Sequence, residues 1–152
     1  NEIWNSIFLL FKGTACMWGA PGDSAYLFLI GLNIEIMFMF AVAGVVFSKM
    51  LHDDPKMKIL GIPNRIFFAL CLSVFCVFIE ILLNKVNALT WDYRYWSATS
   101  PIPIFLFGYL HFFVVAFLVH DMKTLKAKII TVGTIFGIAI LALVIFGGLG
   151  WI

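Results

Sequence analysis

Long apolar runs separated by short polar segments dominate this chain, and they determine the fold that we predict. A membrane-spanning helix needs roughly 20 mostly apolar residues, and runs of that length without alternating polarity are not strands of a membrane barrel. We therefore predict an all-α integral membrane protein, a bundle of four to five transmembrane helices that forms one domain over residues 1–152. The predicted helices lie near residues 25–50, 65–87, 102–120 and 128–152, with an uncertain fifth near residues 3–20.

The composition supports a membrane environment. The chain is 63% hydrophobic and 12% charged, whereas soluble domains carry about 25% charged residues. A small soluble domain leaves much of its surface exposed to water, so lipid is the solvent that suits this sequence. The chain opens without Met and ends in apolar sequence, so we expect it to be incomplete at one or both ends.

Positive charges predict how the helices are oriented. The loop at residues 48–65 contains Lys49, Lys56, Lys58 and Arg65, and the loop at 120–128 contains three further lysines. Loops rich in Lys and Arg stay on the cytoplasmic side of a membrane. We therefore expect these two loops to be cytoplasmic and the loops at 20–24 and 88–101 to be external.

Three ionisable residues fall inside the apolar runs, and such residues are costly in lipid and are functional candidates by default. A helical rise of 1.5 Å per residue places Glu35 and His111 about 15 and 14 Å deep, and Glu80 about 10 Å deep. The catalytic candidates are therefore Glu80, His111 and Glu35. Because an unpaired polar group is poorly tolerated in hydrocarbon, we expect Glu35 and His111 to lie within hydrogen-bonding reach.

A polar stripe runs along the helix predicted at 65–87. Its members recur at helical spacing, so they share one face, and we expect that face to meet protein or a cleft rather than lipid. Glu80, its only acid, is either a general base or proton carrier, or a structural carboxyl group bonded to a neighbour. The stripe consists of Ser73, Cys76, Glu80, Asn84 and Asn87.

An aromatic segment follows this stripe in the external loop. It reads Trp91-Asp92-Tyr93-Arg94-Tyr95-Trp96. Aromatic residues concentrate where a membrane meets water, so the segment is either an interfacial anchor or a binding platform above the stripe. The predicted binding residues are Ser73, Cys76, Asn84, Asn87, Trp91, Asp92, Tyr93 and Arg94.

Other residue patterns restrict the chemistry. Cys16, Cys71 and Cys76 have neither the number nor the spacing of a disulfide framework or zinc site, and we expect buried free thiols. The histidines have no ligand spacing, so we predict no metal site and leave any cofactor unknown. Gly133 and Gly137 form a G-x-x-x-G motif, which permits close packing of helices in a membrane.

The segment from Trp91 to Pro103 resembles part of the membrane carotenoid cyclases. The resemblance lies in Trp91-Asp92-Tyr93 and in Pro101-Ile102-Pro103 at a helix entry. Those enzymes place two acidic residues after the proline, where this chain has Ile104 and Phe105. The resemblance therefore lacks its catalytic part and assigns no family.

The sequence leaves three hypotheses for function. The first is a small accessory subunit, or a fragment, of a larger membrane assembly, since no complete catalytic set is visible. The second is a membrane-embedded enzyme or binding protein for a lipid-like substrate entering near the outer leaflet and using Glu80, Asn84 and His111. The third is a proton-coupled carrier using Glu35 and Glu80. The expected partners are membrane lipids and proteins within the membrane, and the net charge of +2 favours no nucleic acid.

Overall fold

The structure is a computed structural model and describes residues 1–24 and 26–152. It is mostly helical. Within the described residues, three helices are long and apolar enough to cross a membrane. They are α3 (Asn64–Lys85), the continuous helix formed by the π-helical η1 (Ile104–Leu110) and α4 (His111–Asp121), and α5 (Leu125–Gly148).

The helix predicted at residues 25–50 is shorter in the structure. Its N-terminal part forms a hairpin of β2 (Leu27–Leu29) and β3 (Leu32–Asn33), and α2 covers only Ile34–Lys49. Asn33 starts the helix, because its side-chain oxygen accepts a 2.8 Å hydrogen bond from the backbone N–H of Ile36. Sixteen residues of helix span about 24 Å, less than the hydrocarbon thickness of about 30 Å. Ala25, where the sequence analysis starts this helix, lies outside the described residues.

The uncertain helix near residues 3–20 is also shorter than predicted. Helix α1 covers Glu2–Lys12 and ends at Gly13, whose φ of 68° requires the left-handed conformation that glycine adopts easily. The chain then folds back, and β1 (Trp18–Gly19) pairs with β6 (Thr90–Trp91). Asn5, fully buried, stabilises this return by donating to Trp18 O at 2.7 Å and accepting from Met17 N at 2.9 Å. A helix of eleven residues is too short to cross a bilayer by itself.

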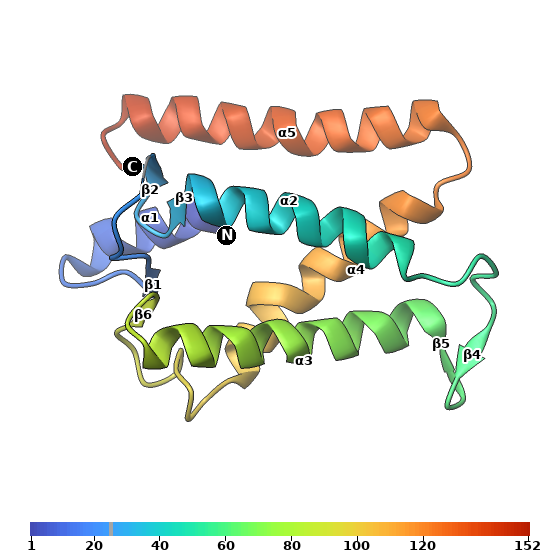
Figure 1. Cartoon of the computed structure of the whole chain (residues 1–152). Helices are drawn as coiled ribbons and strands as arrows, with labels where there is room; N and C mark the ends of the chain where they lie inside the picture. Colours follow the sequence, from blue (N-terminus) through green and yellow to red (C-terminus); the bar gives the residue numbers. More distant parts are fainter. Residues whose placement is uncertain (25) are drawn as a thin grey trace.

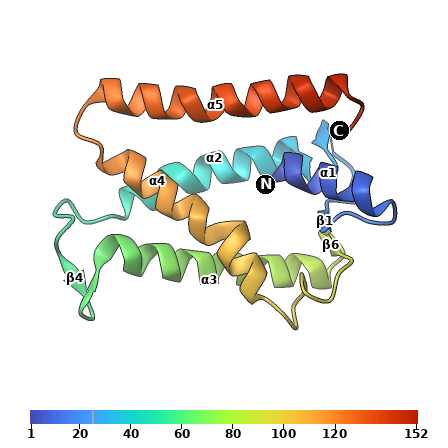
Figure 2. The same ribbon diagram turned by 180° about the vertical axis from the view of Figure 1, so that it is seen from behind.

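The crossing helix formed by η1 and α4 is the structural centre of the bundle. It crosses α2 and α3 at an angle, and both pack mainly on it rather than on each other (Figures 1 and 2). Small residues allow α3 to approach closely: Ala69 and Ser73 are almost fully buried there. The buried core of the crossing helix consists of Ile104, Tyr109, Phe113 and Phe117.

The two ends of the bundle differ in character. The hairpin of β4 (Lys58–Ile59) and β5 (Ile62–Pro63) lies at the end where α4 passes into α5, and β1 and β6 lie at the opposite end (Figure 1). Both lysine-rich loops are therefore at one end, and the aromatic segment is at the other. We refer to these as the basic end and the aromatic end.

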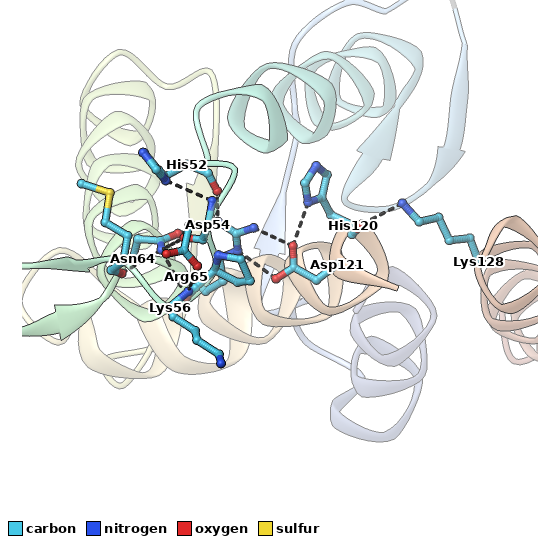
Figure 3. Close-up of polar contacts among 10 residues, drawn as sticks. His52, Asp54, Lys56, Asn64, Arg65, His120, Asp121 and Lys128 are labelled. Atoms are coloured by element: carbon cyan, nitrogen blue, oxygen red, sulfur yellow. Dashed lines mark hydrogen bonds and ion pairs between the residues drawn. The ribbon is translucent and has the colours of Figure 1, made fainter. Parts of the chain in front are cut away.

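A polar network ties the helices together at the basic end (Figure 3). Arg65 donates to both carboxylate oxygens of Asp121, at 2.8 and 2.7 Å, and to His52 O at 2.6 Å. Bidentate pairs of this kind are strong and directional. Lys128 of α5 donates to His120 O at 2.7 Å. The network thus joins the starts of α3 and α5 to the end of α4.

Candidate functional site: a cavity between α2 and α3

A cavity of about 320 Å³ lies between α2 and α3, with the crossing helix as its floor. Pockets for small organic molecules begin near 300 Å³ and are lined mainly by apolar side chains. Met39 of α2 and Phe75 of α3 line the cavity and are also exposed. Because these two side chains border the cavity and are also accessible from outside the bundle, they mark its opening between the two helices.

The cavity is elongated and largely apolar. Its α2 wall runs from Glu35 to Phe47, and twelve helical steps correspond to about 18 Å. Rings of the crossing helix line the cavity opposite α2: the Phe113 centroid lies 5.7 Å from that of Phe47, and the Phe112 centroid 5.4 Å from that of Phe40. Ala43 leaves space in the middle of the α2 wall. This shape suits a long apolar molecule better than a compact polar one.

Three carboxyl groups line the part of the cavity nearer the aromatic end. Glu80 of α3 accepts a 2.7 Å hydrogen bond from the hydroxyl of Tyr109, and Glu2 of α1 accepts one of 3.0 Å from the indole Nε1 of Trp18. Glu35 of α2 accepts a 2.6 Å bond from the hydroxyl of Ser24. Among the described residues that line the cavity, none is a lysine or an arginine.

The Trp18 ring is positioned from three sides. It stacks on Trp96 with ring centroids 5.0 Å apart and is bonded to Glu2 through its nitrogen. On the third side lies Gly31, where a Cβ atom would come within 2.6 Å of the ring. Burial raises the pKa of the Glu2 carboxyl group, and the hydrogen bond from Trp18 opposes that shift only in part. The fold-back after α1 thus brings an acid and an indole to the cavity.

The polar stripe of α3 divides into different environments. Cys76 and Glu80 line the cavity. Ser73 is fully buried and donates to Ala69 O at 2.6 Å, and Asn84 donates to Leu89 O at 3.0 Å. These two residues bond to the backbone and do not border the cavity. Asn87 is exposed and lies beyond the end of α3, with a positive φ of 56°, so the expectation that it faces protein is wrong.

The predicted depth of Glu35, on which the expected contact with His111 rests, is also wrong. Because α2 begins at Ile34, Glu35 lies in the first helical turn instead of ten residues into the membrane, where its carboxyl group bonds Ser24. His111 lies inside the crossing helix, but its side chain is exposed on the face opposite Phe113. The hairpin that replaces the N-terminal part of the predicted helix accounts for the error in depth.

The aromatic segment forms an end wall rather than an open platform. Trp96 is buried and lines the cavity, and the hydroxyl of Tyr93 donates to Ala15 O at 2.9 Å. Trp91 is half-buried against the core, whereas Asp92 and Arg94 are exposed. None of Trp91, Asp92, Tyr93 and Arg94 is among the described residues that line the cavity.

The cysteines occupy three different environments. Cys16 is buried and Cys76 half-buried, but Cys71 is exposed on α3, so the expectation of buried thiols is wrong for Cys71. Within the part of the chain that the structure describes, no three His, Cys, Asp or Glu side chains come together as a metal-binding group.

Sequence reasoning missed several residues of the site. Glu2, Trp18 and Tyr109 line the cavity, yet each depends on contacts between segments far apart in the chain. Of these three residues, only Glu2 could have been identified as a candidate from the sequence, because it is an acid at the edge of an apolar run. Tyr109 looked like one more aromatic residue in an apolar helix.

Comparison with known proteins places the chain in a family. A protein from Archaeoglobus fulgidus described as an uncharacterized protein is 50% identical over 149 residues, which cover 98% of this chain and 71% of the relative. A second protein from that organism, with the same description, is 47% identical over 53 residues, or 34% of this chain and 95% of the relative. No solved structure matches. A family described as an uncharacterized membrane protein family matches residues 1–148, and the chain therefore belongs to that family of membrane proteins.

Proposed function

We propose that this protein binds an elongated apolar molecule taken from the bilayer. The observation that carries the proposal is the cavity of about 320 Å³ between α2 and α3, with apolar walls and carboxyl groups toward one end. Its opening, at Met39 and Phe75, lies between two helices rather than at a loop. A molecule dissolved in the membrane therefore reaches the cavity without passing through water.

Binding is better supported than catalysis or transport. The enzyme hypothesis uses Glu80, Asn84 and His111, and of these only Glu80 lines the cavity. The carrier hypothesis places Glu35 at membrane depth, whereas Glu35 lies in the first turn of α2. A carboxyl group in an apolar cavity can orient a ligand without any further catalytic group.

Filling the cavity is expected to weaken binding strongly. Ala43→Phe adds a ring to the middle of the α2 wall, and we expect at least about a tenfold loss of affinity for a long-chain alcohol, equivalent to about 1.4 kcal/mol. The alcohol carries a nitroxide near its head group and is detected by quenching of tryptophan fluorescence. Trp4→Phe and Trp151→Phe form the background, so that the signal comes from Trp18, Trp91 and Trp96.

The matched control for this experiment is Ala41→Phe. Ala41 is exposed on the same helix and is not among the described residues that line the cavity. This variant is expected to bind like the background protein. Equal quenching in both variants would show that the probe binds elsewhere, and the absence of quenching in the background protein would refute the proposed function.

A second candidate function is that of a subunit in a larger membrane assembly, and α5 favours it. None of the described residues of α5 is buried. A Cβ atom added at Gly133 or Gly137 would meet no atom within 4 Å, so the G-x-x-x-G face is open. Such faces pack closely against other helices in membranes. A protein that copurifies in fixed ratio, together with failure of every apolar probe to bind, would favour this function instead.

We also propose that residues 1–152 form one membrane domain in which α2 is a fourth crossing segment beside the three long helices. The support is that α2 is apolar on all faces and runs alongside α3 and α5 (Figure 1). Its 16 residues would cross with the help of the preceding hairpin.

The sidedness of the loops forms a separate prediction. Single cysteines placed at Lys56 and at Asp92, in a variant lacking the native cysteines, are expected to react from opposite sides of the membrane. Lys56 at the basic end should be cytoplasmic, because lysine-rich loops are retained there. An impermeant maleimide applied to intact cells, then to inverted vesicles, measures this. Reaction of both positions from one side would contradict the proposed crossing pattern.

A further inference from the structure

We infer that the cavity selects an amphiphile whose head group donates hydrogen bonds and carries no negative charge, with Glu80 as the acceptor. This inference rests on the proposed function and adds the chemical class of the ligand. An alcohol or an amine fits the description, and a carboxylate or a phosphate does not.

The first support is the geometry of the carboxyl groups. Tyr109 bonds Oε1 of Glu80, and Trp18 bonds Oε2 of Glu2. Within the described part of the chain, no hydrogen bond reaches the other carboxylate oxygen of either residue. Since a carboxylate can accept several hydrogen bonds, both residues retain acceptor capacity toward the cavity. The tyrosine and tryptophan fix the side chains and leave these oxygens for a ligand.

The second support is the charge of the lining. Glu2, Glu35 and Glu80 contribute acidic groups, and no described lining residue is a lysine or an arginine. Burying an anionic head group beside these acids is costly in a medium of low dielectric constant. The positive group nearest the acids, the α-amino group of Asn1, already interacts with Glu2. A hydroxyl or ammonium group instead supplies donors to the second carboxylate oxygens of Glu2 and Glu80. The lining therefore favours neutral and cationic head groups over anionic ones.

The third support is the position of Glu80 along the cavity. Glu80 lies five residues before the end of α3 at Lys85, which corresponds to about 8 Å. The aromatic rings of Phe47 and Phe113 lie toward the basic end. A bound amphiphile therefore has its head group near the aromatic end and its chain along α2. This orientation matches that of a lipid whose head group lies at the same end of the bundle.

The test compares three nitroxide-labelled amphiphiles of one chain length, an alcohol, an amine and a carboxylate, in nanodiscs of zwitterionic lipid. Quenching of Trp18, Trp91 and Trp96 in the Trp4→Phe, Trp151→Phe background gives the affinities. At neutral pH we expect the alcohol and the amine to bind at least about tenfold more tightly than the carboxylate. In Glu80→Gln, whose shape is nearly unchanged, the ratio of amine to carboxylate affinity is expected to fall about tenfold.

Asp92→Asn is the matched control, because it removes one negative charge at the aromatic end from an exposed residue outside the cavity lining. It is expected to keep the full preference for the amine. Equal binding of all three amphiphiles would overturn this inference and leave the proposed function intact, whereas failure of all three would overturn the proposed function itself. A preference unchanged in Glu80→Gln would show that Glu80 is not the acceptor.

Discussion

Replacing Asn64 with alanine is expected to lower the free energy of unfolding by about 3 kcal/mol. Asn64 is fully buried at the start of α3. Its side-chain nitrogen donates to the backbone oxygens of Asp54, Pro55 and Met57, at 3.0, 3.3 and 2.8 Å. Removing the amide breaks all three bonds at once. Among the described contacts Pro55 O then has no other donor, whereas Asp54 O and Met57 O keep one backbone donor each, Met57 N and Asn64 N. The lost bonds also release the segment whose hairpin sets the start of α3.

The measurement is unfolding in mixed micelles with increasing denaturing detergent, followed by circular dichroism. Asn84→Ala provides the matched control, since Asn84 is half-buried on the same helix and, within the described residues, its side chain donates to one carbonyl group, Leu89 O. Its expected cost is about 1 kcal/mol, the ordinary value of one hydrogen bond. If the two variants lost equal stability, the three bonds of Asn64 would contribute no more to the free energy of unfolding than the single bond of Asn84.

Replacing Gly31 with alanine is expected to disrupt the aromatic end of the cavity. The new Cβ would lie 2.6 Å from the Trp18 ring and 2.8 Å from Nδ2 of Asn5, and neither neighbour can move easily. Trp18 is held by Trp96 and Glu2, and Asn5 is fully buried and bonded to the backbone. Overpacking of this kind costs about 1 to 3 kcal/mol. The variant should also show changed tryptophan fluorescence and reduced probe binding.

Gly133→Ala is the control for this substitution. The added methyl group at Gly133 meets no atom within 4 Å and lies inside α5. Because alanine favours helix over glycine by about 1 kcal/mol, this variant is expected to be as stable as the native protein or more so. Normal binding and stability in Gly31→Ala would mean that the ring of Trp18 is not fixed as described.

The long apolar runs were sufficient to predict the helical membrane character of the chain, because length and hydropathy alone require it. They could not distinguish helix from hairpin at residues 27–33, since a run of apolar residues is compatible with either structure in a membrane protein. A turn glycine and a helix-capping asparagine, Gly31 and Asn33, were present as signals. They were outweighed by the continuity of the apolar run around them.

The sequence predicts members of the site where an ionisable side chain stands within an apolar run. Glu80 is a carboxyl group within an apolar run, and that conflict identified it as a candidate before its neighbours were known. Tyr109 and Trp18 show no such conflict, and their roles arise only when α1 folds back and the crossing helix meets α3. His111 conflicts with its surroundings too, yet it lies outside the cavity, so the signal identifies unusual residues without locating them.

The peripheral position of α5 has a consequence for how this protein can evolve. Every described residue that lines the cavity precedes Val114, and none of the described residues of α5 is buried. Selection on the proposed binding site therefore acts on α2, α3, the crossing helix and the segments at the aromatic end, where Gly31 cannot take even one methyl group without a clash. In α5 it acts chiefly on length and hydropathy. Changes in the surface residues of α5 can therefore create a contact with a new partner without altering the lining of the cavity.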